Sequence, residues 1–252
     1  MSIPIALQLY SVRDDCARDL FGTMKEVAAM GYVGVEFAGF HGHAAADVKK
    51  ALDDLGLRVA GTHTGIDQLA DDKFDATVEY HRVIGAENII VPGLPESVRN
   101  TPAACKETAE KLTAIVNRLA PLGFKTGFHC HDGDVKPLEG GKSAWYLLAE
   151  QTPDAFIMQY DTANGASGGA DPVQPLLDFP GRGVTVHLKG WDATEGWVAV
   201  GEGAMPWGKI FDACETVAGT KWYIVEHEDY EKHSPMEGAR ICIDNLKKLG
   251  KL

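Results

Sequence analysis

The chain has 252 residues, of which 45% are hydrophobic and 24% are charged, and its formal net charge at pH 7 is −12. A chain of this length can bury one large core, so we expect a single domain that spans residues 1–252. The acidic balance argues against nucleic-acid binding, because contact with a phosphate backbone requires a basic surface.

Cysteine usage and the N-terminal segment bear on the cellular location. The five cysteines are scattered, odd in number and form no CxxC pair, which is typical of reduced thiols in a cytoplasmic protein. The opening residues MSIPIALQLYSV contain no basic segment, and no apolar run approaches the ~18 residues of a membrane span. We therefore expect a cytoplasmic protein without a membrane partner.

Strand-like and helix-like segments alternate about eight times along the chain. The expected strands cover residues 3–10, 33–37, 58–62, 88–92, 125–129, 156–161, 184–188 and 222–226. Amphipathic helical segments include residues 19–31, 44–56, 101–123 and 234–250, each of which closes on a glycine typical of a helix C-cap. No glycine-rich nucleotide-binding pattern follows the first strand. The alternation predicts an α/β fold, a single (β/α)8 TIM barrel.

Four consecutive strands in the second half of the chain end in residues that bind metals. His129 and His131 close TGFHCHDGD, Asp161 closes FIMQYD, His187 lies in VTVHLKGW, and Glu226 ends the apolar run of KWYIVEHED. The carboxyl ends of the strands meet at one face of a parallel barrel, where the active site lies. The pattern therefore predicts a metal-dependent enzyme.

Each of these residues also has a simpler interpretation. Asp161 could begin a turn, and His187 could be a hydrogen-bonded core histidine. Glu226 is harder to explain by packing, because charged residues are rarely buried unless they are paired or bound to a metal. His129 and His131 share one face of their strand and could present two imidazoles to one ion, or one to the ion and one to a substrate. Their joint occurrence at the same ends of four strands favours the metal site.

Nearly the whole chain resembles the xylose isomerase-like TIM barrels. This is the sugar phosphate isomerase/epimerase group, which also includes inosose dehydratases, ketose 3-epimerases and endonuclease IV. The segments that carry the resemblance are LQLYSVRDD, GYVGVEFAGF, GFHCHDGD, QYDTANGASGGADPVQPLLDFPGR, VHLKGW, VGEGAMPWGKIFDA and WYIVEHED. The resemblance implies a carbohydrate-modifying enzyme.

The resemblance also implies one divalent metal ion, Mn, Mg, Co or Zn, held at the ends of strands five to eight. Its ligands in this sequence would be His129, Asp161, His187 and Glu226. The family usually has a glutamate at the end of strand five, and this chain has His129 there. The pair of glutamates that exchanges a proton on opposite faces of the sugar is therefore incomplete in this chain.

The resemblance further implies α-proton abstraction from a keto-sugar or keto-polyol through a metal-stabilised enediolate. Glu226 or His131 would move the proton, and Lys189, which faces the same side of its strand as His187, would stabilise the enolate. Either His131 or Asp134 could replace the usual glutamate. Reprotonation gives isomerisation or epimerisation, whereas loss of a β-substituent gives the alternative reaction of an inosose dehydratase-like lyase or a 3-keto-glycoside eliminase.

Other residues at strand ends are expected to contact the substrate. Gln8, Glu36 and His63 end the first three strands, and Trp191 could stack on a sugar ring. Arg182 lies at the opposite end of strand seven, where we expect a structural role. The partner is a small carbohydrate or cyclitol, and relatives commonly form homodimers or homotetramers.

Two readings from other classes stay open at this point. Because the strand-five glutamate is missing, the chain could also be a catalytically degenerate barrel that binds a sugar without converting it. A DNA-repair endonuclease like endonuclease IV is disfavoured by the net charge of −12 and by the short set of ligands.

Overall fold

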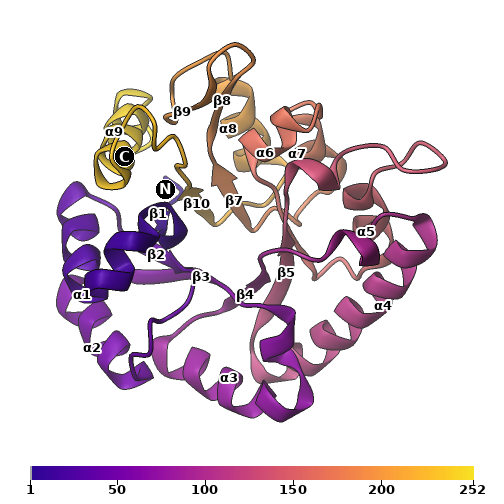
Figure 1. Ribbon diagram of the computed structural model, residues 1–252, viewed down its shortest axis with the longest axis horizontal. Helices are drawn as coiled ribbons and strands as arrows, with labels where there is room; N and C mark the ends of the chain where they lie inside the picture. The colour runs from indigo at the N-terminus through magenta and orange to yellow at the C-terminus, as the bar shows by residue number, and fades with distance from the viewer. Residues whose placement is uncertain (1) are drawn as a thin grey trace.

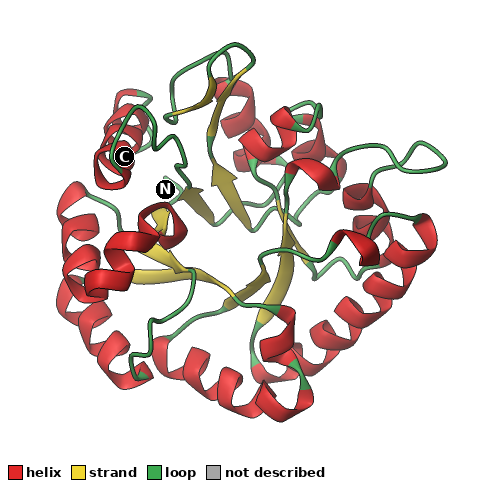
Figure 2. Cartoon of the chain, in the orientation of Figure 1, coloured by secondary structure: helices red, strands yellow, loops and turns green. Residues whose placement is uncertain are grey.

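The computed structural model describes residues 2–252, in which eight parallel strands form a central barrel inside a ring of helices (Figures 1 and 2). The barrel strands are β1 (Ile5–Gln8), β2 (Gly34–Phe37), β3 (Arg58–His63), β4 (Asn88–Val91), β5 (Lys125–His129), β6 (Ile157–Gln159), β7 (Thr185–Leu188) and β10 (Trp222–Val225). Each lies within or one residue beyond the range expected from the sequence. The predicted (β/α)8 barrel is confirmed.

The sheet runs in the order β6-β5-β4-β3-β2-β1-β10-β7. Two backbone hydrogen bonds close it between β6 and β7: Met158 N donates to Arg182 O at 2.9 Å, and His187 N donates to Tyr160 O at 2.9 Å. A parallel bridge joins Asp161 and His187 beside the second bond. Closure of the barrel therefore places two predicted metal ligands next to each other.

Helices cover the outside of the barrel (Figure 2). They are α1 (Arg13–Met30), α2 (Ala45–Leu55), α3 (Asp71–Ile84), α4 (Pro102–Leu119), α5 (Ala144–Gln151), α6 (Thr162–Ser167), α7 (Gln174–Asp178), α8 (Trp207–Thr216) and α9 (Pro235–Lys248). Glycine is needed where a helix ends in the left-handed region, as at Gly31 (φ 106°) and Gly56 (φ 66°). No helix among residues 2–252 is long and apolar enough to cross a membrane.

Three local features differ from the expectation. The first helix, expected from residue 19, begins at Arg13. The first strand ends at Gln8 instead of continuing to Tyr10, because the Gln8 side chain accepts the Tyr10 N–H at 3.0 Å and turns the backbone into a 3-10 helix. A hairpin, β8 (Gly190–Asp192) and β9 (Gly196–Val198), follows β7 and was not expected, since its strands are too short to show a period.

The core lies mainly between the sheet and the helices. Alternate residues of a strand face opposite sides, so Ile5 and Leu7 pack outward on the helices while Ala6 faces the barrel axis. Inside the barrel the apolar layer is small and consists of Ala6, Ala60 and Ile224, with Trp222 packed against it. Polar side chains fill the barrel above that layer, and they form the base of the site.

Candidate metal centre

Four buried side chains meet at the carboxyl end of the barrel. His129, Asp161, His187 and Glu226 each offer one ligand atom, and these atoms all lie within 4.8 Å of one another. His129 is the last residue of β5, His187 lies in β7, and Asp161 and Glu226 follow β6 and β10 closely. The fold thus brings together the four residues that the sequence predicts as metal ligands.

Asp161 uses its two carboxylate oxygens differently. Oδ1 accepts hydrogen bonds from the backbone N–H groups of Ala163 at 2.9 Å and Asn164 at 2.7 Å, which caps the start of α6. Oδ2 is buried and has no hydrogen-bond partner. Burial raises the pKa of Asp161 to about 6, although the nearby Lys189 ammonium opposes the rise. A buried oxygen without a partner is costly in a folded protein, and a bound cation would satisfy it.

His187 lies between two carboxylates. Its Nδ1 is 2.7 Å from Glu226 Oε2 and 3.9 Å from Asp161 Oδ2, and its Nε2 is 2.7 Å from Glu36 Oε2. Burial disfavours the charged ring, but the carboxylates of Glu36 and Glu226 outweigh it and raise the pKa of His187 to about 10. Nδ1 therefore faces the other ligands, while Glu36 holds the ring from behind, as carboxylates commonly do behind metal-binding histidines.

Gln159 fixes the orientation of the other histidines. Its Oε1 lies 3.1 Å from His129 Nδ1 and 2.8 Å from His63 Nε2, and its amide nitrogen donates to Glu36 Oε1 at 2.9 Å. Because the amide nitrogen of Gln159 donates to a carboxylate, its Oε1 must be the atom that accepts hydrogen bonds from both histidine rings. His129 consequently keeps Nε2 as an unprotonated ligand atom. Burial, together with the neighbouring imidazoles, holds the pKa of His129 well below its usual range, so the ring is neutral.

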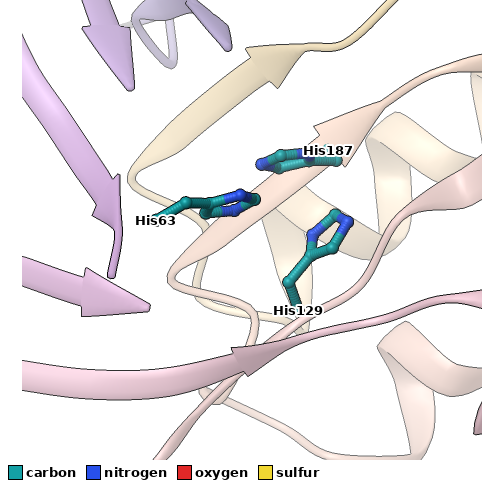
Figure 3. Close-up of side chains that lie close together, drawn as sticks. All are labelled: His63, His129 and His187. Carbon is teal, nitrogen blue, oxygen red and sulfur yellow. The ribbon is translucent and has the colours of Figure 1, made fainter. Parts of the chain in front are cut away.

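Figure 3 shows how the three rings converge from three strands. His63 and His187 are nearly parallel, with an interplanar angle of 4° and centroids 5.3 Å apart. The His129 ring is tilted by 55° to both, with centroids 4.8 Å from His63 and 4.5 Å from His187. His63 also belongs to a second possible ligand group with His129 and His187.

A pocket of about 450 Å³ reaches the ligand cluster, where His129 and Glu226 line its wall. Its wall includes His63, His129, His131, Asn164, Glu226 and Glu228. This volume lies within the range of small-molecule sites, roughly 300–1,000 Å³. A small molecule in this pocket can therefore reach His129 and Glu226 of the cluster.

Lys189 lies buried beside the pocket. Its Nζ is 3.3 Å from Glu226 Oε1 and 3.3 Å from Asn164 Oδ1, and it also contacts Glu228. The ring of Trp197 covers it, with Nζ 4.4 Å from the ring centroid. Burial lowers the pKa of Lys189, but the surrounding carboxylates more than compensate and raise it, so the ammonium stays charged.

His131 and Asp134, the two candidates for the missing glutamate, are placed differently. The His131 side chain is 47% exposed and lies in the pocket wall, and burial lowers its pKa. Asp134 is fully buried, accepts the His131 backbone N–H at 2.7 Å and pairs with Arg99 at 2.8 Å. Asp134 therefore shapes the loop after β5 and lies outside the ligand cluster.

The residues expected to contact substrate fall into two groups. His63 lies in the pocket wall. Gln8 and Glu36 are fully buried beneath the ligands, where Gln8 Nε2 donates to Glu36 Oε2 at 2.7 Å. Trp191 lies on the β8–β9 hairpin against Trp197, with ring centroids 5.0 Å apart, and is outside the pocket wall. Direct contact with substrate stays a prediction for all four of these residues.

Three residues of the site carry roles that sequence reasoning missed. Gln159 orients two histidines, Asn164 faces Lys189, and Glu228 contacts Lys189 from the pocket wall. A period-two signal was present for two of them, since Gln159 lies two residues before Asp161 and Glu228 two residues after Glu226. Nothing local marked Asn164, which reaches the pocket through the turn of α6.

Two known proteins are similar to this chain in sequence. The rhizopine catabolism protein MocC of Rhizobium meliloti is 25% identical over 99% of this chain and 89% of its own length. The inosose dehydratase of Geobacillus kaustophilus is 26% identical over 66% of this chain and 60% of its own length.

Solved structures share the fold. A sugar phosphate isomerase/epimerase from Parabacteroides distasonis superposes with a TM-score of 0.82 at 22% identity, covering 100% of this chain and 96% of that one. The IOLI protein, solved with a bound zinc atom, gives a TM-score of 0.75 at 13% identity, covering 99% of this chain and 98% of that one. The family model of the xylose isomerase-like TIM barrel matches residues 24–249. The chain belongs to the xylose isomerase-like TIM barrel family.

Proposed function

We propose that the protein is a divalent-metal-dependent enzyme that removes the proton next to the carbonyl of a keto-sugar or keto-cyclitol and catalyses isomerisation or epimerisation. The observation that carries this proposal is the buried cluster of His129, Asp161, His187 and Glu226, of which His129 and Glu226 line a small pocket. Relatives named for sugar phosphate isomerisation, inosose dehydration and rhizopine catabolism support a polyhydroxylated substrate.

The donor set fits one divalent ion. Two imidazoles and two carboxylates suit zinc, manganese or cobalt better than magnesium, which prefers oxygen ligands and water. The orphaned Oδ2 of Asp161 is the most direct sign of the fit, since no protein group satisfies it. A bound ion would supply a Lewis acid that polarises the carbonyl and neighbouring hydroxyl of the substrate.

The chain's own groups would move the proton. Glu226 lies in the pocket wall. Burial favours a higher pKa for its carboxyl group, but Lys189 and His187 outweigh burial and hold the pKa of Glu226 well below the usual range. It is therefore an ionised acceptor. His131 presents a half-exposed, neutral imidazole to the same pocket and can take up or return a proton. Lys189 would stabilise negative charge that develops on the substrate oxygen.

A lyase is the second candidate, and the identity of the proton carriers favours it. Epimerisation in this family uses two glutamates, whereas the pocket wall here holds Glu226 with His129 and His131 in place of the strand-five glutamate. An imidazole that protonates a leaving β-hydroxyl or β-glycosyl group would turn the same enolate chemistry into elimination. One relative, from Geobacillus kaustophilus, is named for an elimination reaction, as an inosose dehydratase.

Metal analysis tests the proposal most sharply with Asp161→Asn. This variant keeps Oδ1 as the acceptor that caps α6 and replaces the orphaned Oδ2 with an amide nitrogen. We expect about one equivalent of divalent metal in the wild type and in the surface control Asp212→Ala, and much less in Asp161→Asn and Glu226→Gln. Exchange of the α-proton of keto-sugars in D2O, followed by NMR, should disappear in the same two variants.

The outcomes separate the readings. Sugar products that carry deuterium at C2 or C3 indicate isomerisation or epimerisation. Release of water or of a glycosyl group indicates elimination. A wild-type protein that holds no metal after reconstitution with Mn²⁺ or Co²⁺ would contradict the proposal and leave a sugar-binding barrel.

A further inference from the structure

A second cavity lies beside the pocket over the ligand cluster. This cavity, which we call the outer groove, measures about 600 Å³ and has Phe40, Thr64, Gln68, Ala76 and Tyr80 among its lining residues. It is built from the loops that follow β2 and β3 and from α3, so it opens at the carboxyl end of the strands, as the pocket does. The chemistry proposed above makes no use of it.

His63 joins the two cavities. It lines both the outer groove and the pocket, and its ring is held by Gln159 at 2.8 Å and lies close to His129 and His187. The two cavities therefore meet at one side chain that lines both. This shared wall is the place where a ligand of the pocket would reach toward the outer groove.

The lining of the outer groove suits a ring that has an apolar face and hydroxyl groups. Phe40 and Tyr80 are half-buried and stacked, with ring centroids 4.1 Å apart, and the Tyr80 hydroxyl donates to His43 O at 2.9 Å, which fixes the aromatic surface. The exposed side chain of Gln68 adds an amide that can form hydrogen bonds, whereas the Thr64 hydroxyl is already bonded to Thr62 and His81. An aromatic surface with a few convergent polar groups is how proteins commonly bind ring-shaped small molecules.

Neither cavity is built for an anion. Among the described residues 2–252, the pocket wall contains the carboxylates of Glu226 and Glu228 and neither lysine nor arginine. Lys189, buried beside the pocket, is already paired with both carboxylates. The lysine that lines the outer groove, Lys73, is paired with Asp67 at 2.9 Å, and Asp72 adds another carboxylate. Recognition of phosphate or carboxylate generally requires arginine, lysine or clustered backbone N–H groups. An uncharged ligand is therefore favoured.

We propose that the substrate is an uncharged glycoside whose reacting ring, a keto-sugar, occupies the pocket and whose second ring occupies the outer groove. This inference rests on the proposed function for the reaction at the first ring, and on the groove alone for the binding of the second. The second ring is either another sugar or an aglycone, since both present an apolar face to the aromatic surface formed by Phe40 and Tyr80.

Binding to non-reacting probes tests the inference. The probes are methyl glucoside, a glucose disaccharide and 4-nitrophenyl glucoside, each in α and β form, titrated by calorimetry into metal-free and Mn²⁺-treated protein. We expect at least one two-ring probe to bind about tenfold more tightly than its methyl glucoside. A preference for the disaccharide identifies the second ring as a sugar, and a preference for the nitrophenyl compound identifies it as an aglycone.

A matched pair of variants locates the second ring. Ala76 is an exposed residue of α3 that lines the outer groove, and Ala103 is an exposed residue of α4 that lines none of the cavities described above. Ala76→Trp should fill the groove and weaken two-ring binding about tenfold while leaving methyl glucoside unchanged, and Ala103→Trp should change neither. Equal binding of one-ring and two-ring probes, or two-ring binding that Ala76→Trp does not weaken, would overturn the inference.

Failure of this inference can be told apart from failure of the proposed function. If the protein holds metal and exchanges α-protons but shows no preference for two-ring probes, only the outer groove is misassigned. If two-ring binding depends on Ala76 in a protein that holds no metal and exchanges no protons, the groove assignment stands and the metal chemistry fails.

Discussion

Arg182 offers a direct test of how the barrel is held together at the end remote from the pocket. The guanidinium is buried, and it donates to Phe156 O at 2.9 Å, to Ala149 O at 2.5 Å and to Thr152 Oγ1 at 2.8 Å. The Ala149 carbonyl belongs to the last turn of α5, and the residue four positions later is Pro153, which has no N–H. Arg182 therefore supplies a hydrogen bond to Ala149 O that the helix cannot make.

The expected cost of Arg182→Met follows from these contacts. Methionine keeps much of the buried volume and removes the charge, so part of the desolvation cost is recovered. The variant nevertheless loses three hydrogen bonds, and a buried acceptor left without a partner costs about 1–3 kcal/mol. We expect the free energy of unfolding to fall by about 2–4 kcal/mol, which in a chain of this length lowers Tm by roughly 5–15 °C.

Urea unfolding followed by circular dichroism measures the change, with Arg240→Met as the control. Arg240 is exposed on α9, so its loss should alter the free energy of unfolding by less than about 0.5 kcal/mol. Arg182→Lys should also be destabilised, because one ammonium cannot reproduce the planar three-way contact. Metal content and turnover of folded Arg182→Met should match the wild type. A stable variant with a large loss of turnover would refute the structural role.

Three further predictions concern the site and its surroundings. A Cβ at Gly61 would lie 2.6 Å from Glu36 Oε1, so Gly61→Ala should displace this buried carboxylate. We expect the variant to lose about 1–3 kcal/mol in the free energy of unfolding, measured with urea, and to retain less metal, measured by elemental analysis. Burial lowers the pKa of His81 below 6.5, so as the pH falls below 6.5 the unfolded chain binds a proton that the folded chain does not, and stability is lost until the folded pKa is reached. His81→Gln should therefore lose less stability than the wild type between pH 7.5 and 5.5, and equal losses would contradict this. Lys189→Met should remove the ammonium beside Glu226 Oε1 and lower kcat on the order of 10²-fold with a folded barrel. Near-normal turnover in steady-state kinetics would argue against the role of Lys189.

The alternation of strands and helices and the glycines at helix ends could be predicted because they depend on local chemistry. Alternating segments with glycine at the helix ends are visible in the sequence, since a left-handed C-cap favours glycine wherever it occurs. The positions of His129, Asp161 and Glu226 at strand ends were visible for a similar reason, because a polar residue that closes an apolar run has few structural explanations.

The β8–β9 hairpin and the contacts of Glu36 could not be predicted in this way. The hairpin strands are too short to show a period, and each is held by its partner. Glu36 is the last but one residue of β2, and nothing beside it in the sequence indicates that it would meet His187 and Gln159 inside the barrel. Such contacts depend on the closure of the sheet.

By itself the sequence determined the barrel, the strands that carry the ligands, and the types of group that the site offers, because these follow from periodicity and from the residues at strand ends. Only the tertiary structure decided that Asp161 keeps one oxygen without a partner, that Asp134 faces Arg99 instead of the ligands, and that His63 separates two cavities. These outcomes depend on which side chains meet when the barrel closes and on how much water is excluded there. Neither can be read from residues that lie far apart along the chain.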